Sequence, residues 1–298
     1  QRNMDLLLSG LCPHLAISYI DDILIHTGGS LDDHLDAVVQ VLDRVGGAGY
    51  TFRPGKTYVA ARRVSFLGYD ISEGCIQPSS KHVEQIRDAE FPPDAEGLSR
   101  WIGLVQYFAS HMPYQSLWLG PLHDRVSRKD SGPPSKECLD AFGHVKRVLT
   151  EHGGPVLAMP DFAKPFMLVT DASKRGAGAC LCQLDEAGKE RVVAYWSRRW
   201  TDAESRWYSI EQECAAVHEA IKRFTHYLSG RFTVITDAEA LLYFMTVRNP
   251  QGKFASWTTE LQSYDFTVVH RCGKENGGAD ALSRLALLLP PPPWSRMI

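Results

Sequence analysis

The chain has 298 residues, of which 44% are hydrophobic and 22% charged, a composition typical of globular domains. This length suits one large domain or two ordinary ones and allows a substantial buried core. The 35 acidic and 32 basic residues give a net charge of −3, which excludes a scaffold held on nucleic acid by a general excess of Lys and Arg. An enzyme that acts on nucleic acid is not excluded, because local charge matters more than the total.

The lack of a signal peptide after Gln1 and the scattered cysteines predict an intracellular protein. The chain begins with Gln1 and no signal peptide follows, so we expect a piece cut from a longer product or incompletely recorded. No apolar run approaches the roughly 18–20 residues of a membrane helix. The seven cysteines are scattered, which favours reduced thiols. We therefore expect a protein of a cytoplasmic particle or of the nucleus, neither secreted nor bound to a membrane.

The first stretch, residues 1–75, is apolar and predicts short strands around one helix. Two hairpins and a helix are predicted, at residues 17–26, 64–71 and 32–47. The first hairpin turns at Asp21–Asp22, and the helix follows an Asp-rich start and ends at a Gly pair.

The remaining chain divides into two stretches of different predicted secondary structure and a short tail. Residues 76–135 predict helices broken by prolines at 92–93, 113, 121 and 133–134, with a linker at 131–135. Residues 136–289 alternate strands and helices, and the tail 290–298 is rich in proline. The predicted strands of the third stretch are 166–170, 177–183, 191–196, 232–236 and 266–270. The fold class is therefore α/β (α+β).

Two strands of the third stretch lead into a single carboxylate. Asp171 follows Leu168-Val169-Thr170, and Asp237 follows Val234-Ile235-Thr236. In an open α/β sheet ligands collect beyond the strand ends, so the two acids are expected to meet there. Taken singly, each Asp is as well explained as a cap of the segment that follows.

The helix between these strands supplies a third acid. Its apolar residues step by four and three and form one stripe, Ile210, Cys214, Val217, Ile221, Phe224 and Leu228. At about 100° per residue, Glu213 lies roughly 60° from the centre of that stripe, whereas Glu219 points to solvent. A fourth acid, Asp280, opens the last predicted helix.

Four converging carboxylates repel one another and are costly to bury without cations. Oxygen ligands suit Mg²⁺, with Mn²⁺ as a substitute, and a pair of such ions is the usual apparatus of phosphoryl displacement. The pattern therefore predicts a two-metal site that acts on phosphodiesters.

A series of motifs follows in order along the third stretch: Pro160-Asp161-Phe162, Thr170-Asp171-Ala172-Ser173, Gly176-Ala177-Gly178-Ala179, Tyr208 to Val217, Thr236-Asp237, and Gly273 to Arg284. Together these motifs resemble the ribonuclease H domain of gypsy-class LTR retrotransposons. The resemblance implies a mixed five-stranded sheet flanked by helices, with a metal-binding and catalytic quartet at Asp171, Glu213, Asp237 and Asp280. It further implies nucleic-acid contacts at Ser173 and Asn276, and a role for His270 in product release, although a half-exposed His at a strand end explains that residue equally well.

The first two stretches contain the hairpin Tyr19-Ile20-Asp21-Asp22 and the segment Trp101 to Phe108. These stretches resemble the palm and thumb of a reverse transcriptase, in which the hairpin looks like the catalytic turn and the segment looks like the thumb. The resemblance implies that Asp21 and Asp22 bind metal. The residues implied to contact template or primer are Tyr19, Lys56, Phe66, Leu67, Gly68 and Tyr69.

The front of the chain matches only part of that polymerase. The family's third metal-binding Asp lies on an earlier strand with no counterpart here. We therefore expect one complete domain behind a truncated one, with 1–75 as the C-terminal part of the palm, 76–135 as thumb and linker, and 136–289 as the RNase H-like domain. The chain alone is not expected to extend a primer.

The leading hypothesis is thus a Pol polyprotein fragment that cuts RNA in RNA–DNA hybrids. Its expected partners are the hybrid, template RNA and primer, with protease and integrase segments as further neighbours and an open oligomeric state. The alternative is an inactive or co-opted remnant that binds nucleic acid. Basic pairs near the sites are candidates for phosphate contact, although solvated surface charge is the more common explanation for any single pair: Arg62–Arg63, Lys174–Arg175, Arg198–Arg199 and Lys222–Arg223.

Overall fold

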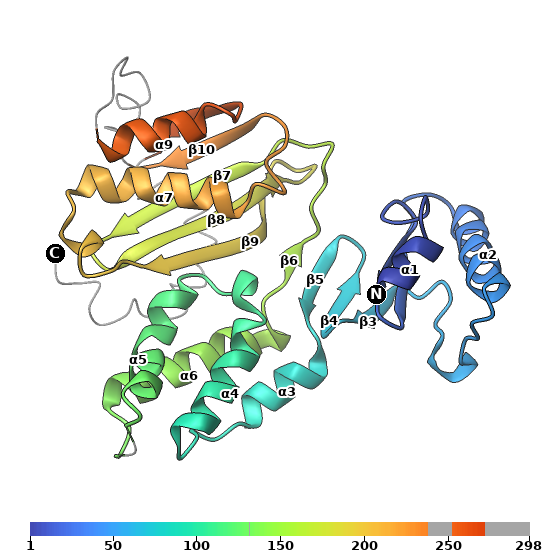
Figure 1. The fold of residues 1–298 in the computed structure, drawn as a ribbon, viewed down its shortest axis with the longest axis horizontal. Helices are drawn as coiled ribbons and strands as arrows, with labels where there is room; N and C mark the ends of the chain where they lie inside the picture. Colours follow the sequence, from blue (N-terminus) through green and yellow to red (C-terminus); the bar gives the residue numbers. More distant parts are fainter. Residues whose placement is uncertain (131, 238–251, 272–298) are drawn as a thin grey trace. The chain divides into compact units, whose positions relative to one another are not determined.

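A computed structural model describes residues 1–130, 132–237 and 252–271 of the chain (Figure 1). The chain separates into two compact units, Gln1–Glu73 and Gly74–Ile298, and each is described by itself. In the part of the chain that is described, no helix is long and apolar enough to cross a membrane.

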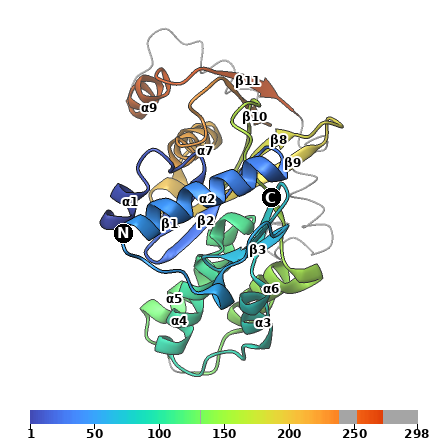
Figure 2. The ribbon, with the colours of Figure 1, turned by 90° about the vertical axis from the view of Figure 1, so that its right-hand side faces the viewer.

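The first unit is a pair of hairpins with helices. Its elements are α1 (Arg2–Leu7), β1 (Ala16–Tyr19), β2 (Asp22–Ile25), α2 (Leu31–Gly47), the 3₁₀ turn η1 (Pro54–Lys56), β3 (Arg63–Phe66) and β4 (Tyr69–Ser72). Helix α2 lies along the β1–β2 hairpin (Figure 2), and its Val41 and Val45 share a buried cluster with Ala16. Ser30 caps α2 by accepting a hydrogen bond from the Asp33 backbone N–H, which explains why the predicted helix begins there.

Both predicted hairpins are present, but the first turns one residue earlier than expected. Tyr19 pairs with Asp22, so Ile20 and Asp21 form the turn and Asp22 belongs to β2. Ile20 adopts a left-handed φ of 54°, which a two-residue hairpin turn demands whatever side chain occupies that position. The second hairpin turns at Leu67 and Gly68, which have φ angles of 48° and 78°.

The second unit opens with strand β5 (Cys75–Pro78) and a group of helices. These are α3 (Ser80–Asp88), α4 (Ala95–Gln106), the 3₁₀ turn η2 (Ala109–His111), α5 (Gln115–Ser127) and α6 (Lys136–Thr150). Helix α5 packs on α4 and α6, and α6 also packs on α3. Pro121 lies inside α5 and does not break it, contrary to the prediction, because α5 buries Trp118, Leu119 and Leu122 and this packing offsets the lost backbone hydrogen bond.

The sheet of the second unit has five strands in the order β11-β10-β7-β8-β9. Strands β7 (Met167–Ser173), β8 (Gly176–Leu184) and β9 (Glu190–Arg199) form the predicted antiparallel meander, each longer than expected. Strands β10 (Phe232–Thr236) and β11 (Phe266–His270) have the predicted bounds, and β10 is parallel to both β7 and β11. The sheet is therefore mixed, as the resemblance implied.

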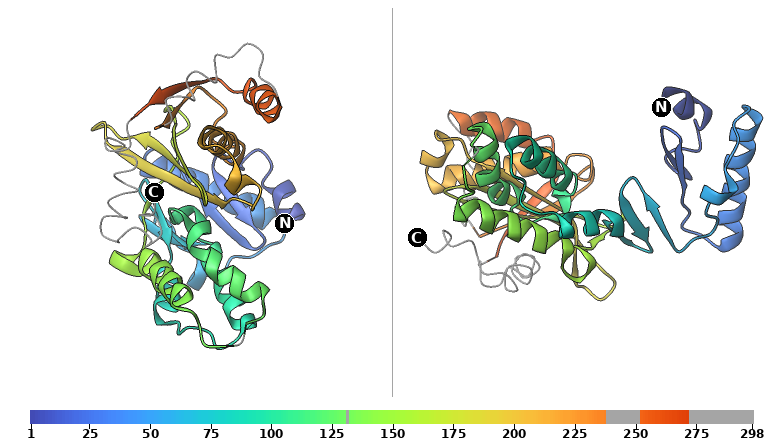
Figure 3. Two further views of the ribbon diagram at one scale, coloured as in Figure 1. Left: turned by 90° about the vertical axis from the view of Figure 1, so that its left-hand side faces the viewer. Right: turned by 90° about the horizontal axis from the view of Figure 1, so that it is seen from below.

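Both faces of this sheet are covered (Figure 3). Helix α7 (Ser209–Arg223) packs on one face with the predicted stripe, although the helix ends at Arg223 and Phe224 and Leu228 reach the same core from the following turns. The 3₁₀ turn η2 and helix α5 contact β9. A second core lies between β7, β8 and β9 on one side and Ile76, Tyr114 and Leu157 of β6 (Leu157–Ala158) on the other. Helix α9 (Lys253–Leu261) packs on α7, and short 3₁₀ turns η3 (Glu151–Gly153) and η4 (Glu204–Arg206) complete the elements.

Candidate metal centre

Three carboxylates from three separate elements meet at one point in the second unit. Asp171 comes from β7, Glu213 from α7, and Asp237 from the residue after β10. One oxygen atom from each lies within 4.8 Å of the others. Among the residues that the structure describes, no other three His, Cys, Asp or Glu side chains gather in this way.

The parallel pairing of β10 with β7 brings the two aspartates together. Ile235 lies opposite Val169, so the residues two positions later, Asp237 and Asp171, reach the same level of the sheet. Asp171 does not lie beyond a strand end as predicted, because β7 continues to Ser173 and pairs Asp171 with Gly178 of β8. The site therefore lies where β10 ends beside a longer neighbour.

Glu213 reaches the aspartates because of its position on α7. Its neighbour Cys214 lies in the core with Val217 and Ile221, and Glu213 itself is 7% exposed. Its buried Oε2 atom has no hydrogen-bond partner among the residues that the structure describes. Burial, followed by the charges of Asp171 and Asp237, raises the pKa of Glu213 to about 8. The three carboxylates therefore lack a balancing positive charge among the described residues.

Asp171 is held by hydrogen bonds from a side chain and from the backbone. Tyr114 donates a hydrogen bond from its hydroxyl to Oδ2 of Asp171 over 3.1 Å. Burial and the charge of Asp237 raise the pKa of Asp171, while the hydrogen bonds from Tyr114 and the Ala172 backbone act in the opposite direction. Tyr114 was missed by the sequence analysis, because it lies far from the acids in the chain and belongs to none of the motifs.

The donor set fits a divalent cation. All three ligands are carboxylate oxygens, which Mg²⁺ and Mn²⁺ prefer. Within the described residues, Oε2 of Glu213 has no hydrogen-bond partner and two of the acids have raised pKa values, so the side chains described around the cluster do not neutralise it. A cation would supply what the surrounding side chains do not.

The chain is similar to known proteins. Residues 161–264 match the model of the RNase H-like domain found in reverse transcriptase. The chain is 33% identical over 288 residues to a retrovirus-related Pol polyprotein from transposon 412 of Drosophila melanogaster, covering 96% of this chain and 23% of that protein. It is 30% identical over 274 residues to the transposon Tf2-3 polyprotein of Schizosaccharomyces pombe, covering 90% of this chain and 20% of that protein.

The chain is related to the Pol polyproteins of gypsy-type retrotransposons. It spans about a quarter of the length of the curated relatives it matches. A solved structure of a foamy viral protease-reverse transcriptase in complex with RNA/DNA hybrid has a TM-score of 0.74 at 20% identity, covering 91% of this chain and 37% of that one. This likeness confirms the RNase H-like fold.

The other residues predicted for the RNase H-like region have different placements. His270 ends β11 opposite Thr236, and its Nε2 donates to the Asp237 carbonyl over 3.1 Å, which places it beside the acid cluster. Ser173 is exposed at the end of β7, where its hydroxyl accepts a hydrogen bond from the Arg175 backbone. Asp280 and Asn276 lie outside the described residues.

The site residues predicted for the palm of the polymerase all lie in the first unit. Asp21 and Asp22 are exposed at the first hairpin, beside Tyr19, which is 51% exposed. Gln1 contacts this turn, where its side-chain oxygen accepts a hydrogen bond from the backbone N–H of Ile20 over 2.6 Å. Lys56 is exposed in η1, and the segment from Phe66 to Tyr69 forms the second hairpin turn. In the described residues the pair Asp21–Asp22 is not part of a three-residue acid cluster.

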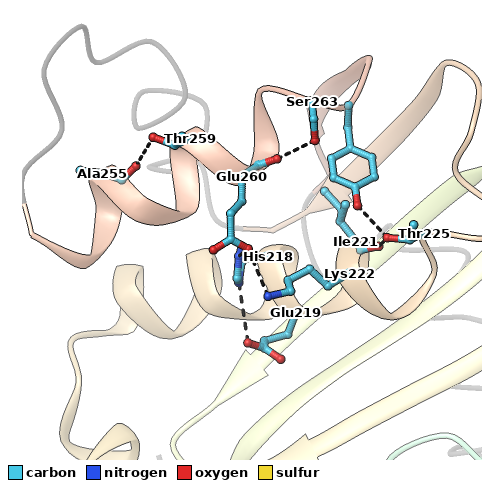
Figure 4. Close-up of polar contacts among 10 residues, drawn as sticks. His218, Glu219, Ile221, Lys222, Thr225, Ala255, Thr259, Glu260 and Ser263 are labelled. Carbon is cyan, nitrogen blue, oxygen red and sulfur yellow. Dashed lines mark hydrogen bonds and ion pairs between the residues drawn. The ribbon is translucent and has the colours of Figure 1, made fainter.

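Several basic side chains that were candidates for phosphate contact are held in ion pairs. Arg63 pairs with Asp70 over 2.8 Å, and Arg198 pairs with Glu204 over 2.6 Å. Lys222 of α7 binds Glu260 of α9 over 3.1 Å, and the same carboxylate binds His218 (Figure 4). These contacts favour a structural role for the side chains of Arg63, Arg198 and Lys222.

Proposed function

We propose that the chain is a nuclease that cuts the RNA strand of RNA–DNA hybrids internally and requires Mg²⁺. The observation that carries this proposal is the convergence of Asp171, Glu213 and Asp237 within 4.8 Å in an RNase H-like fold. The three acids come from a strand, a helix and a strand end that are far apart in the chain, so no local turn accounts for their meeting. Asp280 is proposed as the fourth ligand.

Each described acid has a distinct part in holding two cations. Burial raises the pKa of Glu213 to about 8, and a cation bound nearby would favour its ionised form at neutral pH. Asp171 is fixed by hydrogen bonds, and Asp237 is exposed at the rim where a phosphodiester approaches. The bound ions would activate the attacking water and stabilise the leaving oxygen. Mn²⁺, which accepts the same oxygen ligands, is proposed as a substitute.

The substrate proposal draws on the solved relatives. Foamy viral protease-reverse transcriptases have been solved in complex with RNA/DNA hybrid and with dsDNA. A hybrid is recognised by groove shape and 2′-hydroxyls rather than by base sequence. His270, beside Asp237, is proposed to assist product release.

For the first unit we propose half of a polymerase site. Asp21 and Asp22 provide two metal ligands, and a third acid would have to come from a segment of the parent polyprotein that precedes this chain. The parent would then be an RNA-directed DNA polymerase that uses template RNA and primer. Protease and integrase segments of the same polyprotein are proposed as further neighbours.

Cleavage of defined duplexes tests the nuclease proposal. The purified chain is incubated with end-labelled RNA–DNA hybrid, double-stranded RNA and double-stranded DNA of one sequence, with Mg²⁺ or with a chelator. We expect internal cuts only in the RNA of the hybrid, and only with Mg²⁺. An intact hybrid in the presence of folded protein would favour the alternative, an inactive remnant that binds nucleic acid.

A further inference from the structure

Tyr114 has an unusual position for a residue that contacts the metal centre. It precedes α5 at the N-cap position, outside the sheet that carries Asp171 and Asp237. Side chains at this position usually cap the helix, and Ser, Thr, Asp and Asn are preferred there. Tyr114 makes no capping hydrogen bond, and its hydroxyl donates instead to Oδ2 of Asp171 over 3.1 Å.

Tyr114 has a backbone conformation that is unfavourable for its residue type. Its φ is 52°, in the left-handed region that bulky residues rarely adopt. Such a conformation costs on the order of 1 kcal/mol or more and persists only where surrounding contacts determine it. The contacts of Tyr114 must therefore offset this cost.

Two contacts fix the segment around Tyr114 on the sheet. The backbone N–H of Ser116 donates to the Ser197 hydroxyl of β9 over 2.9 Å. The ring of Tyr114 lies against Gly178, where a Cβ would come within 2.8 Å of Cε1 of the tyrosine. Gly178 is the residue that pairs with Asp171 across β7 and β8. The ring thus occupies a space that this glycine leaves beside the acid.

We propose that Tyr114 is a positioning residue of the metal centre, whose hydroxyl holds one oxygen of Asp171 and fixes the orientation of the carboxylate toward the cations. This inference rests on the proposed metal-dependent function. A neutral hydroxyl orients the carboxylate without cancelling its charge, whereas a Lys or Arg would compete with the cations. Groups that orient metal ligands in this way typically change metal affinity or activity by about 10–100-fold when they are removed.

The test compares Tyr114→Phe with Tyr264→Phe. Both substitutions remove one hydroxyl and keep the ring, but the hydroxyl of Tyr264 hydrogen-bonds to Thr225 over 2.6 Å rather than to one of the three clustered acids. Mg²⁺ and Mn²⁺ binding are measured by titration calorimetry without nucleic acid, and hybrid cleavage is measured over a range of Mg²⁺ concentrations. For Tyr114→Phe we expect about tenfold weaker Mg²⁺ binding and cleavage that recovers at saturating Mg²⁺. Tyr264→Phe should match the wild type.

The outcomes separate this inference from the proposed function. Equal Mg²⁺ affinity of folded Tyr114→Phe and wild type would overturn the positioning role. A wild type that binds Mg²⁺ but leaves hybrids intact would contradict the nuclease proposal, while the titrations would still decide the role of Tyr114. A wild type that does not bind Mg²⁺ would overturn both.

A measurement on the wild type covers the case in which Tyr114→Phe does not fold. Cation binding at Asp171 changes the charge next to the Tyr114 hydroxyl, so the near-ultraviolet tyrosine difference spectrum should change in step with Mg²⁺ binding. A flat difference spectrum during a calorimetrically observed Mg²⁺ titration would contradict the inference.

Discussion

The two units of this chain both carry acids on short β-structure, and they do so in different ways. In the first unit Asp21 and Asp22 are neighbours in sequence and exposed on one hairpin. In the second unit Asp171, Glu213 and Asp237 come from three elements, and Glu213 is 7% exposed. A hairpin presents its acids through local structure alone, whereas the cluster requires a complete sheet and its helix. Adjacent acids in a sequence are therefore weaker evidence of an assembled site than distant acids that converge.

Removal of one cluster acid should have the largest effect. Glu213→Gln or Asp237→Asn should lower hybrid cleavage by more than about 100-fold, the upper limit for groups that only support a ligand. Asp21→Asn in the first unit serves as the control and should leave hybrid cleavage unchanged. The rates are measured with labelled hybrid at saturating Mg²⁺. Loss of cleavage in Asp21→Asn would show that the two acid sites depend on each other.

Primer extension tests the acids of the first unit. The isolated chain should incorporate no nucleotide on a primed RNA template, because the two acids of its hairpin are not joined by a third in the described residues. A longer chain that includes the preceding segment of the parent gene should incorporate nucleotides. Robust extension by the 298-residue chain would show that the hairpin suffices.

Gly178→Ala should weaken the metal centre without touching an acid. The added Cβ would lie 2.8 Å from the Tyr114 ring, so the ring must move away from Asp171. We expect a loss of stability of about 1–3 kcal/mol and weaker Mg²⁺ binding in the same direction as Tyr114→Phe. Chemical denaturation and calorimetry measure the two effects. Gly188→Ala provides a contrast, because open space surrounds Gly188 and only its φ of 75° resists the change.

Stability without divalent cations should fall as the pH rises from about 5 to about 8. In the folded chain the pKa of Glu213 is about 8, whereas its ordinary value is 4.5. Between these values the folded state binds more protons than the unfolded state, so stability decreases with rising pH. Melting temperatures in chelator should follow this trend, and Glu213→Gln should flatten it. A melting temperature that rises over this range would contradict the raised pKa.

His270→Ala should have the smallest effect. If the imidazole assists product release, multiple-turnover cleavage should slow by less than the roughly 100-fold expected for a general acid or base, and single-turnover cleavage should not change. Rapid-quench kinetics separate the two rates. A matched loss in both would place His270 in the chemical step.

The elements that were predicted well have strong local signals. Strands β10 and β11 have the predicted bounds because each is a short apolar run that ends in a polar residue. The apolar stripe of α7 identified Glu213, because the helical period relates a core face to its flank. Where the structure departs from the prediction, tertiary contacts decide: β7 continues past Asp171 because β8 pairs with it there.

Tyr114 illustrates what the sequence does not contain. Its left-handed backbone and its role as a donor depend on Gly178 and Asp171, which lie more than fifty residues away along the chain. Neither helical nor strand periodicity relates residues at that distance. The one-residue shift of the first hairpin turn has a similar origin, because Gln1 binds the backbone of Ile20 and stabilises a turn that an Ile side chain disfavours.

The parallel pairing of β10 with β7 has a consequence for folding kinetics. Antiparallel β7, β8 and β9 are joined by short turns, whereas Thr233 must find Met167 after the whole of β8, β9 and α7 has been traversed. The entropy lost in closing that long loop must be overcome before the pairing stabilises the chain, so we expect this pairing to be the slow step of folding. Asp237 joins the cluster only when the step is complete. During refolding, the return of Mg²⁺ binding should therefore lag behind the return of secondary structure.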